Sequence, residues 1–367
     1  MKKSILLTVL CIILTAAGAE EKKIGLCLSG GGAKGAYEAG VWIAMEQMHL
    51  TDNITAVSGT SVGALNGALF TNVSPYSVKK LWKTQIGFDS VLTPDFDKYA
   101  DVLSFTMDYS RTLLSLYNEY KENALSDDSP FLKSLEQAGT DLASSIASYL
   151  KDYFTSGKGA KGIFSRSKLT SIIEENIDFN SLKDRKAKIY VTCLKKSNLA
   201  RKIMSISFAG YSDYSETFIL NEQTSAENVT KLLLASSAMP GIFDTVHLDS
   251  SIIKNGSSLS EDGEYIDGGF ENAGGQNIPV KPLLKDENVD TVIVVYLRSD
   301  SSLGDSKISR SGTKLNGKKL IEIVPSQPLG DLIHGTLNFN EEQIDALIRL
   351  GYTDARKVLK EHSDLLY

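Results

Sequence analysis

The chain is poor in cysteine, histidine and tryptophan, with three, four and two of these residues among 367. So few cysteines exclude a disulfide-stapled scaffold, and no Cys/His spacing matches a zinc site. Cys27 and Cys193 both lie inside short apolar runs, a setting typical of buried thiols. We therefore predict two buried free cysteines rather than a disulfide or a metal site.

An excess of basic residues is also absent. Lysine and arginine total 39 against 45 aspartate and glutamate residues, which gives a formal net charge of −6. An acidic chain is a poor partner for nucleic acid. It gains nothing from anionic lipid headgroups either, so contact with a membrane surface would be transient and made by apolar side chains. With 42% hydrophobic and 23% charged residues, the composition predicts an ordinary globular protein with an ample core.

The apolar run at residues 5–17 is about 13 residues long, whereas a helix that spans a bilayer needs roughly 20. Lys2 and Lys3 precede this run and Ala17-Gly18-Ala19 ends it, the order found in a secretory signal peptide. We predict that residues 1–19 are such a leader, cleaved after Ala19, and that the protein is periplasmic or secreted. An uncleaved anchor helix is the alternative. Cleavage would shift the net charge from −6 to −8.

Two strand-turn-helix units follow one another at the start of the remaining chain. Residues 24–29 form an apolar strand that leads through a glycine turn at residues 30–35 into a helix at residues 36–48. Residues 54–58 form a second strand, followed by another glycine-containing turn and a helix of small residues. This repetition predicts a parallel α/β sheet with its functional loops at the carboxyl ends of the strands.

Further along, apolar runs predict strands at residues 189–194, 292–297 and 320–324. A polar stretch with scattered aromatic residues at about 93–159 predicts a helical insertion. Asn340, with Gln343 three residues later, predicts the start of a helix that runs from Glu341 to about Leu350. The fold class is therefore α/β, a three-layer α/β/α sandwich with a mostly parallel central sheet. Residues 20–367 form one domain that includes the insertion.

The turn after the second strand reads Gly59-Thr60-Ser61-Val62-Gly63. This is the pattern of a nucleophile elbow, in which a serine stands on a sharp strand-to-helix turn between glycines because side chains there would clash. Ser61 would then project its hydroxyl above the sheet. The pattern makes Ser61 the candidate nucleophile of an acyl-transfer reaction.

The first turn contains Gly30, Gly31, Gly32 and Gly35. Backbone N–H groups of such a turn at a helix N-terminus bind negative charge and suit an oxyanion hole. The same spacing fits a dinucleotide-binding fingerprint, but that site expects an acidic residue at the end of the second strand, where this chain has its elbow. No Gly-Lys-Ser/Thr follows, which also argues against a Walker-type phosphate loop. We expect Lys34 to be a solvated residue at the start of the helix, with a role in orienting the turn as the alternative.

A serine nucleophile needs a base, and the base is less clear from the residues alone. None of the four histidines lies in a motif that would place it over a strand end. The chain order Ser61, Asp267, His334 is nominally compatible with a Ser-His-Asp triad. His334, however, has the setting of a surface or packing residue. Both a triad and a base other than histidine stay open at this point.

Four motifs stand in order along the chain: the glycine turn at residues 30–35, the elbow at residues 59–63, residues 235–240 (Ala-Ser-Ser-Ala-Met-Pro), and Asp267-Gly268-Gly269. In this order and combination the sequence resembles the patatin-like phospholipases. The resemblance extends from Ile24 to the C-terminal helix. Each motif alone is common, but the ordered set of four is specific.

The resemblance implies a Ser-Asp dyad, in which Ser61 attacks an ester carbonyl and Asp267 takes its proton directly. It implies that Gly30, Gly31 and Gly32 form the oxyanion hole, and that Gly35, Gly59, Gly63, Gly268 and Gly269 shape the supporting turns. No metal and no cofactor are expected, and the substrate would be a lipid or phospholipid. The alternatives are a Ser-His-Asp esterase and a catalytically inactive, exported lipid-binding homologue. Ester position, the acyl acceptor and oligomeric state stay open.

Overall fold

The computed structural model describes residues 22–94, 162, 164–197, 214–271 and 274–362. Two predictions fall outside these residues: the signal peptide at residues 1–19 and nearly all of the helical insertion at about 93–159. Both stay predictions. Within the described part, no helix combines the length and the apolar character that a bilayer-spanning segment requires.

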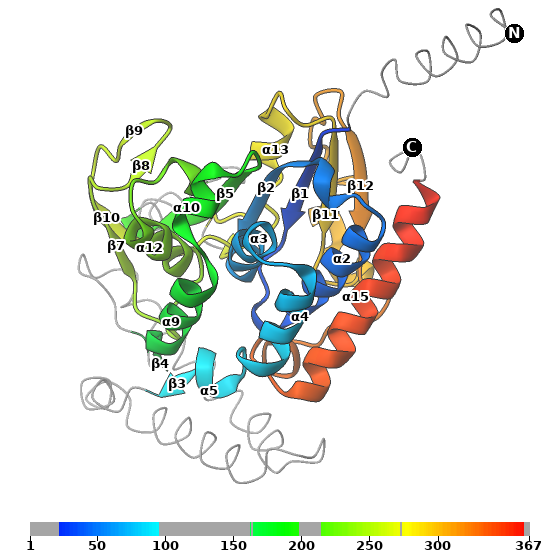
Figure 1. Ribbon diagram of the computed structural model, residues 1–367, viewed down its shortest axis with the longest axis horizontal. Coiled ribbons are helices and arrows are strands. Elements are labelled where there is room, and N and C mark those ends of the chain that lie inside the picture. Colours follow the sequence, from blue (N-terminus) through cyan, green and yellow to red (C-terminus); the bar gives the residue numbers. More distant parts are fainter. Residues whose placement is uncertain (1–21, 95–161, 163, 198–213, 272–273, 363–367) are drawn as a thin grey trace, which may run out of the picture.

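Eight strands of the described chain form one mixed sheet, in the order β12-β11-β1-β2-β5-β10-β7, with β6 pairing β5 as well. The neighbours from β12 to β5 are parallel, whereas β6, β10 and β7 are antiparallel to their partners. Figure 1 shows this sheet running through the middle of the molecule. The strands are β1 Ile24–Leu28, β2 Ile54–Thr60, β5 Lys188–Lys195, β6 Ser215–Ile219, β7 Val246–Leu248, β10 Gly263–Asp267, β11 Thr291–Val295 and β12 Lys319–Ile323.

Helices cover both faces of the sheet and give the predicted α/β class. On the face of the sheet with the larger core cluster are α2 (Gly35–Gln47), α3 (Val62–Asn72), α4 (Pro75–Thr84), α9 (Ser167–Asn176), α12 (Ala226–Ser236) and α15 (Glu341–Glu361). On the other side are α13 (Lys281–Lys285) and α14 (Asp300–Leu303). The remaining short elements are α5 (Phe88–Val91), α10 (Phe179–Asp184), the 3-10 turns η1 (Gly32–Lys34), η2 (Thr51–Asn53), η3 (Leu220–Glu222) and η5 (Gly304–Ser306), and the π-helical turn η6 (Leu332–Thr336).

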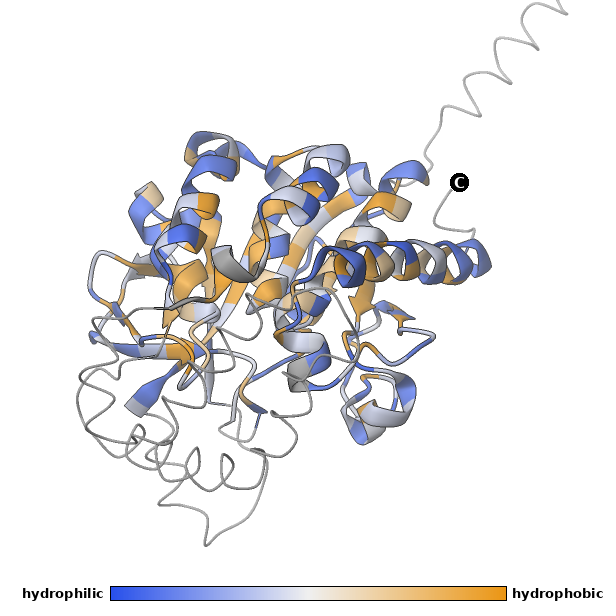
Figure 2. Ribbon diagram, turned by 90° about the horizontal axis from the view of Figure 1, so that it is seen from below, coloured by the Kyte–Doolittle hydropathy of each residue, from blue (hydrophilic) through white to orange (hydrophobic). Residues whose placement is uncertain are grey.

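The core has two parts, one on each face of the sheet. In β1, Leu26 and Leu28 belong to the larger cluster and Cys27 to the smaller one, as the alternation of side chains along a strand requires. All residues of β1 and β11 are buried, which explains why these central parallel strands read as continuous apolar runs. Figure 2 shows hydrophobic residues gathered on the strands and on the helix faces that meet them.

The structure confirms the predicted strands to within a few residues, and it confirms Cys27 and Cys193 as buried free thiols. The last helix begins as predicted, with the Asn340 side chain accepting a hydrogen bond from the Gln343 amide at 2.7 Å. Its predicted end at about Leu350 is wrong, because α15 continues to Glu361.

The reason for the longer helix is that Gly351 serves packing rather than helix termination. A Cβ at Gly351 would lie 2.0 Å from the carbonyl oxygen of Tyr37, and one at Gly40 would lie 2.1 Å from that of Ile348. Two glycines therefore let α2 and α15 approach closely. The buried Tyr37 hydroxyl also donates to the Asp354 carboxylate at 3.0 Å.

The two ends of the predicted insertion lie side by side. Thr93 pairs with Ser165 and Pro94 with Phe164 in a short antiparallel ladder, formed by β3 (Thr93–Pro94) and β4 (Phe164–Ser165). The chain therefore leaves the α/β body and rejoins it at one point. Another two-stranded ladder, β8 (Ile253–Lys254) with β9 (Ser257–Ser258), forms a hairpin near the edge of the sheet.

Candidate active site

Strand β5 brings the candidate nucleophile and the candidate base together. Its residue Thr192 pairs with Thr60 at the end of parallel β2, and the next residue, Cys193, pairs with Asp267 at the end of antiparallel β10. Because β6 occupies the opposite edge of β5 over the same residues, β2 and β10 must share one edge. They therefore meet end to end, and Ser61 lies where the two strand ends face each other.

Ser61 adopts φ 54° and ψ −126° between β2 and α3. This backbone conformation, with a positive φ, is unfavourable for any residue other than glycine and marks a strained turn. The two flanking glycines make the turn possible. A Cβ at Gly59 would lie 2.3 Å from the Gly63 carbonyl oxygen, and a Cβ at Gly63 would lie 2.4 Å from that of Leu28. Ser61 therefore lies on a strained strand-to-helix turn between two glycines that have no room for a side chain.

Asp267 lies at the end of β10 with only 6% of its surface exposed. Its carboxylate accepts a hydrogen bond from the Gly269 amide at 2.7 Å and interacts with the Ser61 hydroxyl. Burial raises the pKa of Asp267 from 3.8 to about 6, and the Ser61 hydroxyl and the Gly269 amide partly oppose the rise. The carboxyl is therefore a stronger base than a solvated aspartate and is still ionised at neutral pH.

The glycine turn lies beside Ser61. A Cβ at Gly30 would come within 3.3 Å of the Ser61 Cβ. The Gly30 amide donates a hydrogen bond to the Asn277 carbonyl at 3.1 Å. This bond does not involve the amides of Gly31 and Gly32, the other two predicted oxyanion donors. Gly32 has φ 58°, and a Cβ there would lie 2.3 Å from the Thr336 carbonyl oxygen. Of the three predicted oxyanion donors, Gly32 also lines the pocket described below.

Gly35, Gly268 and Gly269 all lie where the backbone packs tightly. A Cβ at Gly35 would lie 2.3 Å from a Val62 methyl carbon, and one at Gly268 would lie 2.2 Å from the Thr192 carbonyl oxygen. One at Gly269 would come within 2.7 Å of an Asn277 side-chain oxygen and 3.1 Å of an Asp267 carboxylate oxygen. These glycines let the turns close around Ser61 and Asp267.

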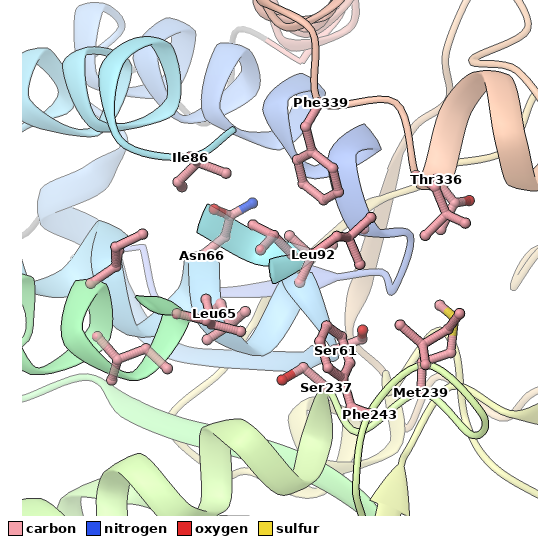
Figure 3. A pocket seen from close by; sticks show the side chains of 18 of the residues that line it. Ser61, Leu65, Asn66, Ile86, Leu92, Ser237, Met239, Phe243, Thr336 and Phe339 are labelled. Atoms are coloured by element: carbon pink, nitrogen blue, oxygen red, sulfur yellow. The ribbon is translucent and has the colours of Figure 1, made fainter. Parts of the chain in front are cut away.

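An apolar pocket opens beside Ser61 (Figure 3). Its walls come from α3, α4, α5, α9, the segment after α12, and residues 336–339. Ser61, Asn66, Ser237 and Thr336 are the polar side chains among the described residues that line it, and aliphatic and aromatic side chains form the rest. Figure 3 shows Ile86 across the pocket from Ser61 and Met239. Such a cavity accommodates a hydrocarbon chain next to the nucleophile.

A buried polar network supports the wall between this pocket and the glycine turn. Glu38 is fully buried, accepts a hydrogen bond from Asn66 Nδ2 at 2.8 Å, and has a pKa that burial raises well above its usual range. Asn66 Nδ2 also donates to the Gly35 carbonyl at 3.0 Å, and Asn66 Oδ1 accepts from Trp82 Nε1 at 3.1 Å. The network thus ties α3 to α2, to α4 and to the Gly35 end of the glycine turn.

Lys34 corrects one expectation. It is 8% exposed rather than solvated, and burial lowers the pKa of its amine while Asp331 opposes the fall. Its side chain passes close to Gly335, because a Cβ there would lie 2.4 Å from Lys34 Cε. Lys34 therefore packs the glycine turn against the η6 segment.

The histidines lie outside this arrangement. The Nδ1 atom of His334 lies 3.0 and 3.1 Å from the two carboxylate oxygens of Asp331, on a side chain that is 40% exposed. His247 pairs in the same way with Glu264 at 3.0 Å. Among the described residues, no histidine forms a hydrogen bond with Ser61 or Asp267.

Several residues of the site gave no signal in the sequence. Asn277 approaches two of the site glycines, Glu38 and Asn66 form the buried network, and residues 336–339 complete the pocket from the far end of the chain. None belongs to a recognisable spacing. Among the described residues, no group of three or more metal-ligating side chains comes together.

The family model described as patatin-like phospholipase matches residues 26–284. VipD from Legionella pneumophila has 16% identity and a TM-score of 0.42, with 94% of this chain and 68% of that chain covered. The ExoU–SpcU complex from the type III secretion system of Pseudomonas aeruginosa has 15% identity and a TM-score of 0.35, with 93% of this chain and 52% of that chain covered. Human GIVD cytosolic phospholipase A2 has 8% identity and a TM-score of 0.44, with 95% of this chain and 60% of that chain covered. The chain thus spans about half of the ExoU chain. No curated protein shows significant sequence similarity to it.

Proposed function

Because the chain belongs to the patatin-like phospholipase family, whose model matches more than half of its length, we propose that it hydrolyses lipid acyl esters with Ser61 and Asp267 as a catalytic dyad. Membership of the family supports the class of lipid hydrolase. One observation carries the finer assignment: the Ser61 hydroxyl lies close enough to the buried Asp267 carboxylate to lower its pKa, and an apolar pocket opens beside it. A hydroxyl paired with a base is the arrangement that activates a serine nucleophile.

In the first step of the proposed reaction, Ser61 Oγ attacks the ester carbonyl carbon while Asp267 accepts the hydroxyl proton. Negative charge develops on the carbonyl oxygen, and the Gly31 and Gly32 amides are the donors best available to stabilise it. The tetrahedral intermediate then expels the alcohol, which takes the proton from Asp267. An acyl group remains on Ser61.

In the second step, Asp267 accepts a proton from water, which attacks the acyl-enzyme. The fatty acid leaves and the proton returns to Ser61, so that both residues regain their starting states. A pKa of about 6 suits both roles of Asp267, because an acid–base group works best when its pKa lies near the working pH.

The substrate we propose is a phospholipid or lysophospholipid cleaved as by a phospholipase A. The pocket beside Ser61 is lined almost entirely by apolar side chains, which favours a fatty acyl chain over a small polar acyl group. The acyl chain would lie along α3 toward Ile86, with the ester at Ser61.

The test compares the wild type with Ser61→Ala, Asp267→Asn and His334→Ala. Fatty acid release from phosphatidylcholine in mixed micelles and turnover of a short p-nitrophenyl ester are both measured on folded protein. Loss of the nucleophile or the base is expected to lower turnover by roughly a thousandfold. His334→Ala is expected to retain wild-type turnover, because its imidazole pairs with Asp331.

The other readings predict different results. A Ser-His-Asp esterase requires His334→Ala to lose activity together with the Ser61 variant. An inactive lipid-binding homologue requires the wild type to bind a fatty acid without any Ser61-dependent release. Ester cleavage that proceeds unchanged in folded Ser61→Ala and Asp267→Asn would refute the dyad.

Export is proposed on the sequence alone. The leader at residues 1–19 predicts a mature chain that begins at Glu20. N-terminal sequencing of protein recovered from a bacterial periplasm or culture medium measures this directly. Recovery of the protein with its N-terminal Met intact would contradict the prediction.

A further inference from the structure

Ser236, the last residue of α12, is completely buried, and its hydroxyl bridges the sheet and the elbow. Ser236 Oγ accepts a hydrogen bond from the Ser61 amide at 2.9 Å and donates to the Thr192 carbonyl at 2.7 Å. Since a hydroxyl carries one proton, these two bonds determine its orientation. We call this pair of hydrogen bonds the Ser236 bridge.

The neighbouring serine behaves differently. The Ser237 hydroxyl donates to the Leu233 carbonyl at 2.9 Å, within its own helix, as serines in helices commonly do. The Ser236 hydroxyl instead points away from α12 and contacts strand β5 and the elbow that follows β2. The orientation of the Ser236 hydroxyl is therefore set by β5 and the elbow, not by its place in the helix.

The same short segment also holds the candidate base. The Asp267 amide donates to the Ala238 carbonyl at 2.9 Å, and the Gly268 amide approaches the Ser236 carbonyl at 3.4 Å. Residues 236–238 thus contact the backbone of the nucleophile through a side chain and the backbone of the base through carbonyl groups.

We propose that Ser236 is a positioning residue that sets the separation between the Ser61 hydroxyl and the Asp267 carboxylate. This role rests on the proposed function of the dyad. The elbow at Ser61 is strained, and strain of this kind persists only where surrounding contacts hold it. The amide of Ser61 is buried as well, and the bridge supplies its partner. One hydroxyl therefore satisfies the elbow and anchors it to β5, the strand that also pairs with β10.

Removing this hydroxyl has a specific consequence. In Ser236→Ala, the Ser61 amide and the Thr192 carbonyl both lose a partner, and the elbow is free to relax away from Asp267. A displacement of about 1 Å at a reacting group costs roughly a hundredfold in rate. We expect kcat for a short ester to fall roughly tenfold to hundredfold, with KM changed by less than about threefold, because the pocket is untouched.

Ser58→Ala is the matched control. Ser58 is a fully buried serine on the same strand as the elbow, and its hydroxyl donates to the Pro279 carbonyl at 2.6 Å. This variant also removes one buried hydroxyl, but it leaves the Ser61 amide bonded. We expect Ser58→Ala to retain kcat at a similar loss of stability. Ser236→Cys, which keeps a weak acceptor at the same place, is expected to lie between Ser236→Ala and the wild type.

Three measurements decide the proposal: unfolding by urea, steady-state kinetics, and backbone hydrogen exchange of the peptide that contains residues 58–64. The proposal is supported if Ser236→Ala loses kcat and exchanges faster in this peptide while Ser58→Ala does neither. It is overturned if Ser236→Ala matches Ser58→Ala in kcat, or if the exchange of the peptide is unchanged.

Should Ser236→Ala fail to fold, a Ser236→Cys variant with wild-type kcat would overturn it, and one with lowered kcat would support it. A wild type without Ser61-dependent turnover would instead refute the proposed function, and the exchange measurement would still test the bridge.

Discussion

Replacing Asp267 by asparagine should stabilise the protein at neutral pH while it removes activity. The carboxyl is 6% exposed, and burial raises its pKa from 3.8 to about 6 although the Ser61 hydroxyl and the Gly269 amide oppose the rise. A group whose pKa rises on folding disfavours the folded state when it is ionised. Asparagine has a similar shape, keeps an acceptor for the Gly269 amide, and carries no charge to desolvate.

The size and sign of the effect follow from the two pKa values. The rise from 3.8 to about 6 corresponds to roughly 3 kcal/mol of lost stability when Asp267 is ionised in the folded protein. Below pH 4 the carboxyl is protonated in both states, so this loss is absent there. As the pH rises from about 4 to 6 the loss develops, and above pH 6 it stays constant. The stability gained by Asp267→Asn should therefore grow from near zero at pH 4 to roughly 3 kcal/mol at pH 7.

Urea denaturation of the wild type and Asp267→Asn between pH 4 and pH 8 measures this difference. Asp300→Asn is the control, because hydrogen bonds from Arg310 and Lys307 lower the pKa of Asp300. Asp300 contributes stability above its unfolded pKa that is lost as the pH falls, so its replacement should give no gain at neutral pH. A difference between Asp267→Asn and the wild type that stays flat over this range, or a less stable Asp267→Asn at pH 8, would refute the reasoning.

Other predictions concern the site and its support. Ester hydrolysis by the wild type should fall about tenfold per pH unit below pH 6, because Asp267 must be ionised; a pH–rate profile that is flat down to pH 4.5 would contradict this. Glu38→Gln should cost less than about 1 kcal/mol, because burial raises the pKa of the carboxyl and glutamine keeps the acceptor for Asn66 without a charge to desolvate, whereas Glu38→Ala should cost about 3 kcal/mol in urea denaturation. Gly63→Ala should yield no folded, active protein by circular dichroism and ester assay, since its Cβ would lie 2.4 Å from the Leu28 carbonyl oxygen. Ile86→Trp should lower kcat/KM for long-chain esters at least about tenfold more than for short ones, because it fills the pocket away from Ser61.

The parallel half of the sheet was predictable from the sequence, because its strands are buried on both faces and read as apolar runs. The antiparallel half was not. The sequence of β10, Gly-Glu-Tyr-Ile-Asp, mixes polar and apolar residues, and β6 is similarly short and mixed. Such strands are stabilised by their partners and by one buried face, so their local composition carries little signal.

The candidate site divides in the same way. The elbow at Ser61 was predictable, because the turn has no room for side chains at its two glycine positions, a local requirement that the sequence shows directly. The closeness of Asp267 followed only from the family resemblance, since it depends on β10 running along the same edge of β5 as β2. Two strand ends that meet although they lie more than 200 residues apart in the chain leave no spacing in the sequence.

Buried polar contacts were the least predictable feature. Lys34 looked like a solvated helix residue, yet the η6 segment covers it. Ser236 and Ser237 are identical neighbours in the sequence, and only the structure distinguishes the one that bonds Ser61 from the one that bonds its own helix. Their roles depend on which backbone groups lie within reach after folding.

Covalent labelling of the folded wild type with a fluorophosphonate, followed by peptide mapping, tests the central claim most directly. The account predicts one adduct on Ser61, a labelling rate that falls below pH 6, and much slower labelling in Asp267→Asn, because the buried carboxylate accepts the Ser61 proton. His334→Ala should label at the wild-type rate. Absence of the adduct from Ser61, or unchanged labelling of Ser61 in folded Asp267→Asn, would contradict the account.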